Sequence, residues 1–190
     1  MHKIFKEFTP SQIKNLNHLA DYLADGCEGS EMEFRMEEFL TIPGYGLSED
    51  YPSILLDDQS EKANICGSSA CAIGHGPLAG VDPKKYECWT EYAARCFNVF
   101  MSQGDVAGEF MFGCGWDLTK HNKPLDASAR IRYFLKHKAV PDDFGLYSDC
   151  GESIYSLKEP YHENNVIFLD DFRNRMNVVM KEVHNDQEGD

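Results

Sequence analysis

The chain has 190 residues, of which 42% are hydrophobic and 12% aromatic, so it can bury the core of one domain without stabilising cross-links. Charged residues make up 26%, which excludes wholesale disorder, collagen-like sequence and a long coiled coil. The chain carries 32 acidic against 18 basic residues, a net charge of −14, and this argues against a protein that binds the phosphate backbone of nucleic acids.

Cysteine content and the lengths of the apolar runs bear on the cellular compartment. The seven cysteines are an odd number, which favours reduced thiols over the paired disulfides of a small secreted domain. The first residues contain no apolar run typical of a secretory signal. Runs such as 166–169 are far shorter than the ~20 residues of a membrane helix. We therefore expect a cytoplasmic protein without a membrane segment.

The first predicted helix covers residues 10–25. Thr9 can cap it, Pro10 suits the first helical position, and Gln12 completes a capping box. Gly26 can adopt the left-handed conformation that ends many helices.

A second helix is predicted from Asp82-Pro83 to Phe100. Its apolar residues recur at helical spacing and form one wide face: Tyr86, Trp89, Ala93, Cys96, Phe97 and Phe100. We expect this face to lie in the core, with Trp89 and Phe97 nearly fully buried and Cys88 on the opposite face.

The second half of the chain contains two more predicted helices. In residues 108–116 aromatic residues alternate with glycines, which predicts a short β-hairpin or an irregular segment. Asp126 is expected to cap a helix of about 127–139 that stops before Pro141. Apolar residues from Leu169 to Val183 fit a last amphipathic helix. The predicted fold is mainly α, a single compact domain of about four to six helices over residues 1–184 with an acidic tail at 185–190.

A cysteine-containing segment is the first candidate for a site, with Cys66, Gly67, Cys71, Gly74 and His75 as its motif. If a serine at 68 or 69 caps a short helix, Cys71 and His75 lie on one helix face at i, i+4. The many alanines and glycines around them favour a structural interpretation, in which small residues allow close packing and the cysteines fill the core.

Two alternatives assign chemistry to this motif. Cys66, Cys71 and His75 could hold zinc with Cys114 or Cys88 as the fourth ligand, although the C-x4-C-x3-H spacing differs from the tight C-x2-C knuckle. A cysteine could instead be a nucleophile, with His75 or His121 as its base. We expect no catalytic residues and no cofactor, with zinc as the alternative.

Basic residues gather between positions 120 and 138, where six Lys or Arg accompany one acid. Lys120, Lys123, Arg132 and Lys136 form a candidate binding patch for an acidic partner or for the chain's own acidic segment 47–61. The structural alternative is the solvated back of a helix.

The motif Cys66-Gly-Ser-Ser-Ala-Cys-Ala-Ile-Gly-His75 resembles the C-G-[TS]-x-x-C-x-x-G-[HW] core of an uncharacterised family of small phage and bacterial proteins. Residues 16–23, 33–36 and 127–135 are similar to further elements of that family, so the resemblance covers about residues 10–140. It implies a mainly helical domain in a phage or mobile-element context and carries over no catalytic residues.

These observations predict a non-catalytic binding or interaction protein, encoded by a phage or prophage, that acts on a host protein in the cytoplasm. One alternative is a thiol- or zinc-dependent hydrolase that uses Cys66, Cys71 and His75. The other is an acidic nucleic-acid mimic, which the net charge of −14 allows.

Overall fold

A computed structural model describes residues 2–4, 6–27, 33–34, 69–100, 105–113, 116, 119–144 and 163–188. The described chain is mainly helical, as predicted, and its five α-helices fall within the predicted four to six. They are α1 (Pro10–Ala24), α2 (Trp89–Phe97), α3 (Val106–Phe112), α4 (Pro124–His137) and α6 (Glu163–Glu188). None of the described helices is long and apolar enough to cross a membrane.

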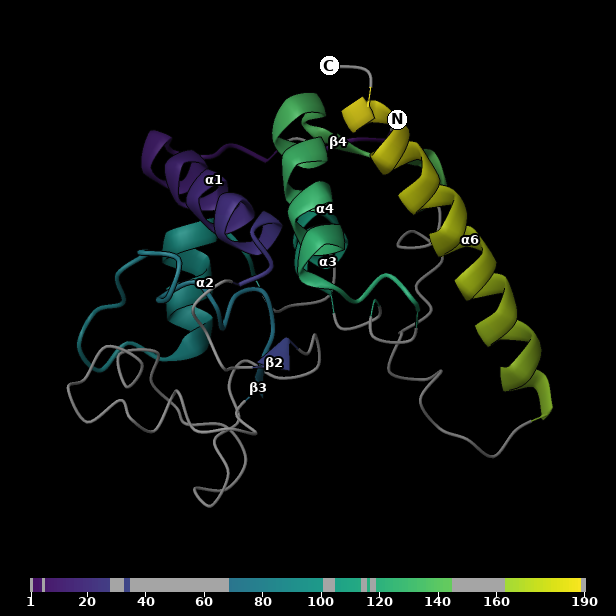
Figure 1. The fold of residues 1–190 in the computed structure, drawn as a ribbon, viewed down its shortest axis with the longest axis horizontal. Coiled ribbons are helices and arrows are strands. Elements are labelled where there is room, and N and C mark those ends of the chain that lie inside the picture. The colour runs from purple at the N-terminus through teal and green to yellow at the C-terminus, as the bar shows by residue number, and fades with distance from the viewer. Residues whose placement is uncertain are drawn as a thin grey trace.

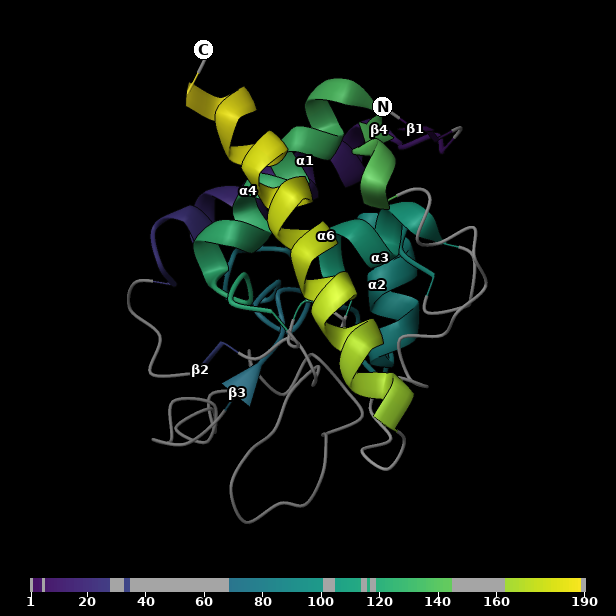
Figure 2. The ribbon, with the colours of Figure 1, turned by 90° about the vertical axis from the view of Figure 1, so that its right-hand side faces the viewer.

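Helix α4 lies at the centre of the described elements. It packs against α1 on one side and α6 on the other, with α3 behind it (Figure 1). Figure 2 shows α6 as the outermost helix on its side of the molecule. The Oγ of Ser128 donates to the carbonyl of Ala20 at 2.7 Å and so ties α4 to α1. The Phe8 ring meets Phe134 of α4 edge-on at 5.6 Å between centroids.

Two pairs of short strands accompany the helices. β1 (His2–Lys3) pairs antiparallel with β4 (Ala139–Val140), with His2 opposite Val140. β2 (Glu33–Phe34) pairs in parallel with β3 (Ser69–Ala70). Through the second pair, Ser69 and Ala70, which directly precede Cys71, lie beside Glu33 and Phe34, which follow α1 in the chain.

The prediction for α1 is confirmed, including its caps. The Oγ1 of Thr9 accepts from the Gln12 amide at 3.2 Å, and the Gln12 side chain accepts from the Thr9 amide at 3.0 Å. Gly26 follows the helix with a φ of +72°. Because these signals lie within four residues of each helix end, local sequence determines the helix bounds.

The predicted start of the second helix is wrong. α2 begins at Trp89, and Cys88 is its half-buried N-cap rather than a residue on the opposite helix face. The preceding residues form a turn because the Glu87 carboxylate accepts from the Lys84 amide at 2.9 Å and from Arg95 Nη2 at 2.6 Å.

The apolar face of α2 is therefore shorter than predicted. Trp89 and Phe97 are buried, as expected, but Tyr86 precedes the helix with a φ of +63° and is 72% exposed. Phe100 lies beyond the left-handed C-cap residue Asn98 and is also exposed.

The predicted hairpin or irregular segment at 108–116 is wrong for its first half, which belongs to α3. Asp105 caps this helix by accepting from the Gly108 amide at 3.1 Å. A side chain at Gly108 would meet the Asp105 carboxylate and Val99, so this glycine reflects close packing rather than a turn. The indole nitrogen of Trp116 donates to the carbonyl of Phe110 at 2.9 Å and anchors the chain after the helix.

The bounds of the last two helices also differ from the prediction. α4 begins at Pro124 with Lys123 as N-cap, so Asp126 lies in the first turn and is not the cap. The helix ends at His137 because Lys138 adopts a left-handed φ of +52°. α6 continues to Glu188, past the point at which the sequence predicts that a polar tail begins.

Candidate functional site

The cysteine motif is deeply buried where the structure describes it. Residues 70–77 are all buried, and Cys71 is a free thiol. The amide of His75 donates to the carbonyl of Cys71 at 3.1 Å, so the predicted i, i+4 relation holds within a series of turns. Cys66 and Gly67 lie outside the described residues, as does Cys114.

The surroundings of Cys71 and His75 favour the structural interpretation of this motif, in which its side chains fill the core. The His75 ring is fully buried and stacks on Phe34 at 5.7 Å between centroids, with Tyr22 at 5.9 Å. Burial raises the pKa of the Cys71 thiol to about 11, against the opposing effect of backbone hydrogen bonds. Because the thiolate is the nucleophile, a thiol with this pKa reacts poorly at neutral pH. A zinc site built with Cys66 and Cys114 stays a prediction.

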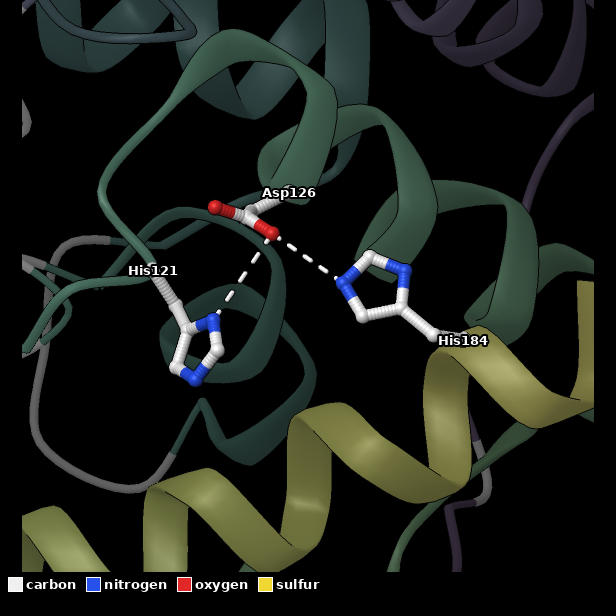
Figure 3. Close-up of side chains that lie close together, drawn as sticks. All are labelled: His121, Asp126 and His184. Carbon is white, nitrogen blue, oxygen red and sulfur yellow. Dashed lines mark hydrogen bonds and ion pairs between the residues drawn. The ribbon is translucent and has the colours of Figure 1, made fainter.

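A different group of side chains converges at the junction of α4 and α6. Figure 3 shows the carboxylate of Asp126 between the rings of His121 and His184. His121 lies in the segment that leads into α4, Asp126 in the first turn of α4, and His184 on α6. Each residue offers one ligand atom, and these three atoms lie within 4.8 Å of one another.

The distances within this cluster suit a small ion. The Nε2 of His184 is 3.1 Å from Asp126 Oδ1, and the Nδ1 of His121 is 3.8 Å from the same oxygen. Ligands bound to zinc at ~2.0–2.1 Å in a tetrahedron are separated by about 3.3 Å. Small side-chain movements would therefore bring all three donors to binding distance.

A hydrogen bond to Asn177 orients the ring of His121. The Oδ1 of Asn177 lies 3.0 Å from His121 Nε2 and, as an amide oxygen, can only accept. With the amide oxygen placed there, the ring donates from Nε2, and Nδ1 is the nitrogen nearer the Asp126 carboxylate. Burial lowers the pKa of His121, although the Asn177 hydrogen bond and the Asp126 charge oppose this effect, so the neutral ring is favoured. Metal-binding histidines are commonly oriented by such a partner on the other ring nitrogen.

Arg130 supports the cluster from the core. Its guanidinium is fully buried, lies 4.2 Å from the Trp116 ring centroid, and donates from Nη1 to the carbonyl of His121 at 3.0 Å. Burial lowers the pKa of Arg130 to about 9, against the effect of the Asp126 charge, so the group is cationic at neutral pH. This charge attracts the Asp126 carboxylate.

The donor set indicates which ions fit. Two imidazoles and one carboxylate suit zinc and other first-row transition metals, whereas calcium and magnesium require several oxygen ligands. His121 and His184 have side chains that are 15% and 41% exposed, so an ion can reach the cluster from solvent.

The four basic residues of the predicted patch are all exposed. Arg132 Nη2 lies 2.9 Å from Asp21 of α1, and Lys136 Nζ lies 3.3 Å from Asp186 of α6. The acidic segment 47–61 lies outside the described residues. Lys120 and Lys123 flank His121 in sequence, so part of the patch borders the cluster.

Comparisons with known proteins give no relative: no family model matches the chain, and no curated protein or solved structure shows significant similarity to it. The resemblance of the cysteine motif to a phage and bacterial family therefore stays a prediction.

Sequence reasoning missed the cluster as a unit. It considered His121 as a base for a cysteine and Asp126 as a helix cap, and it assigned His184 no role. The available signal was weak, because His184 follows Asp126 by 58 residues and no short motif joins them.

Proposed function

We propose that the protein binds a divalent transition-metal ion, with zinc as the most suitable ion, through His121, Asp126 and His184. The observation that carries this proposal is the convergence of the three ligand atoms. His121 Nδ1 lies 3.8 Å from Asp126 Oδ1, and a cation bound between them would be attracted by the carboxylate and by the lone pair of a neutral ring. To bind the ion through Nε2, the His184 ring carries its proton on Nδ1 instead, or a doubly protonated ring releases the Nε2 proton to solvent.

Three protein ligands leave a fourth position for water or for a group from another molecule. Closed structural zinc sites use four protein ligands, whereas open sites use three and border solvent. The partly exposed histidines agree with an open site. The proposal is therefore a metal-binding protein whose ion can be approached from outside.

Calorimetric titration with zinc tests this function, using the full chain and the variant His184→Ala. We expect the variant to lose more than about 100-fold in affinity, because even residues that only orient ligands contribute about 10–100-fold. His137→Ala is the matched control, since His137 also lies at the α4–α6 junction, 3.0 Å from Asp186, but outside the cluster. Equal zinc affinity of His184→Ala and the unmodified protein would reject the proposal.

A second proposal is the non-catalytic interaction protein expected from the sequence, phage- or prophage-encoded and acting on a host cytoplasmic protein. Its support is the exposed segment of Lys120, Lys123 and Leu125, which can meet an acidic partner beside the cluster. Capture of a lysate protein that weakens with salt and is lost in Lys120→Glu/Lys123→Glu would support it. Lys14→Glu/Lys84→Glu, at exposed lysines elsewhere, is the control. Capture unaffected by the first variant would count against this role for the segment.

The two alternative functions are less well supported. Of the two cysteines in the hydrolase hypothesis, Cys71 is buried with a raised pKa, and Cys66 lies outside the described residues. The nucleic-acid mimic rests on the net charge of −14 alone.

A further inference from the structure

The proposed metal site joins α6 to the rest of the molecule. Two of its ligands, His121 and Asp126, belong to the start of α4, whereas His184 lies on α6. Among the described side chains of α6, residues 173–187, the buried apolar ones lie on one stripe: Met176, Val179, Met180 and Val183. Exposed residues surround this stripe, so the described part of α6 is held along one face only.

Polar contacts lie on both flanks of that apolar stripe. On one flank, Glu182 accepts from the Tyr133 hydroxyl at 2.7 Å, and Asp186 pairs with Lys136 and His137 of α4. On the other flank, Asn177 and His184 meet His121 and Asp126. The metal ligands therefore lie on the second flank alone, which allows the contribution of an ion to be separated from that of the ion pairs.

We infer that metal binding controls the docking of the C-terminal half of α6 on α4. This inference rests on the proposed metal site. When α6 separates from α4, His184 leaves and only His121 and Asp126 remain as ligands. The ion then binds the docked state far better than the separated one, so it shifts the equilibrium toward docking.

The size of the effect follows from this linkage. If the separated state does not bind the ion, a free ion concentration of ~100 times the dissociation constant lowers the separated population about 100-fold. The amide hydrogens of residues 176–186 then exchange about 100-fold more slowly, because they exchange when the helix is separated and frayed. Helix α1 contributes no ligand and is expected to change little.

Hydrogen exchange measured by mass spectrometry on the full chain, with and without zinc, tests this inference. The expected result is slower exchange in peptides from 174–188 and little change in peptides from 10–24. In His184→Ala the zinc effect on α6 is expected to vanish. In His137→Ala, which removes a contact on the opposite flank, it is expected to persist.

The outcomes separate this inference from the proposed function. If calorimetry shows zinc binding but exchange in α6 is unchanged, the docking inference is wrong and the metal site stands. Equal slowing in α1 and α6 would show that zinc stabilises the whole fold, and this too would overturn it. If zinc does not bind in calorimetry, both proposals are wrong.

Discussion

The turns from Cys71 to Gly80 and the cluster of His121, Asp126 and His184 both contain side chains that can bind metals or transfer protons. In the first region the Cys71 thiol and the His75 ring are buried, and the ring lies against Phe34 and Tyr22. In the second, three ligand atoms converge at a helix junction, on side chains that solvent reaches in part. The residue types in the two regions are similar. The regions differ in how far the side chains are buried and in how their potential ligand atoms are oriented.

The difference shows that the densest local motif in the sequence and the cluster proposed to bind a metal lie in different parts of the fold. Around Cys71 the small residues let the chain pass close to α2, where a side chain at Gly76 would meet Tyr92 and Phe97. Around Asp126 the sequence is unremarkable, and the ligands meet only because α6 returns to α4.

The largest expected effect is the difference in alkylation rate between the thiols of Cys71 and Cys88. The rise in the Cys71 pKa from 9.0 to about 11 lowers its thiolate fraction about 100-fold at pH 8, before any steric protection. The alkylation rate should increase about tenfold per pH unit up to that pKa, as long as the fold persists. Mass spectrometry after iodoacetamide treatment should find half-buried Cys88 modified well before Cys71. Equal rates at pH 8 would reveal an accessible Cys71 and restore the nucleophile hypothesis.

Gly76→Ala is expected to destabilise the fold by ~1–3 kcal/mol, as overpacked core substitutions do. The added Cβ would lie 2.9 Å from the Ile73 carbonyl oxygen and 3.1 Å from Phe97 Cζ. Gly80→Asn is the control, because Gly80 has open space and a positive φ that asparagine tolerates. Chemical denaturation measures both free energies. A loss of less than about 0.5 kcal/mol in Gly76→Ala, the size of an ordinary surface effect, would contradict the packing account.

Charge reversal at Arg132 and Lys136 is expected to lower the free energy of unfolding the least, by ~0.2–1 kcal/mol for each exposed pair. The pairs are with Asp21 and Asp186, and added salt should reduce the difference from the unmodified protein. Lys120→Glu/Lys123→Glu removes no ion pair among the described residues and serves as the control. Unchanged stability in Arg132→Glu/Lys136→Glu would mean that these side chains are only the solvated back of α4.

Local signals explain what could be predicted from the sequence. The capping residues of α1 lie beside the helix they start, so its bounds followed from Thr9, Pro10 and Gln12. The start of α2 could not be predicted in this way. The turn that precedes it depends on Glu87, which pairs with Arg95 eight residues later in the chain. α3 was missed because Gly108 resembled a turn residue, whereas it is needed where Asp105 and Val99 pack closely.

The candidate site could be predicted least, because it depends on tertiary structure. Asp126 and His184 are 58 residues apart, and helical periodicity places each on its own helix without relating the two helices. The exposure of Arg132 and Lys136 was predictable, because both lie on the face of α4 opposite its apolar residues. Their acidic partners on α1 and α6 were not, because they depend on how those helices pack.

X-ray absorption at the zinc edge of the zinc-loaded protein tests most directly which of the two regions binds the ion, because it identifies the ligand atoms. The account predicts nitrogen and oxygen ligands at ~2.0–2.1 Å, with scattering from two imidazoles that falls to one in His184→Ala. Sulfur ligands at ~2.3 Å would contradict it, since the ion would then be held by cysteines and not by His121, Asp126 and His184.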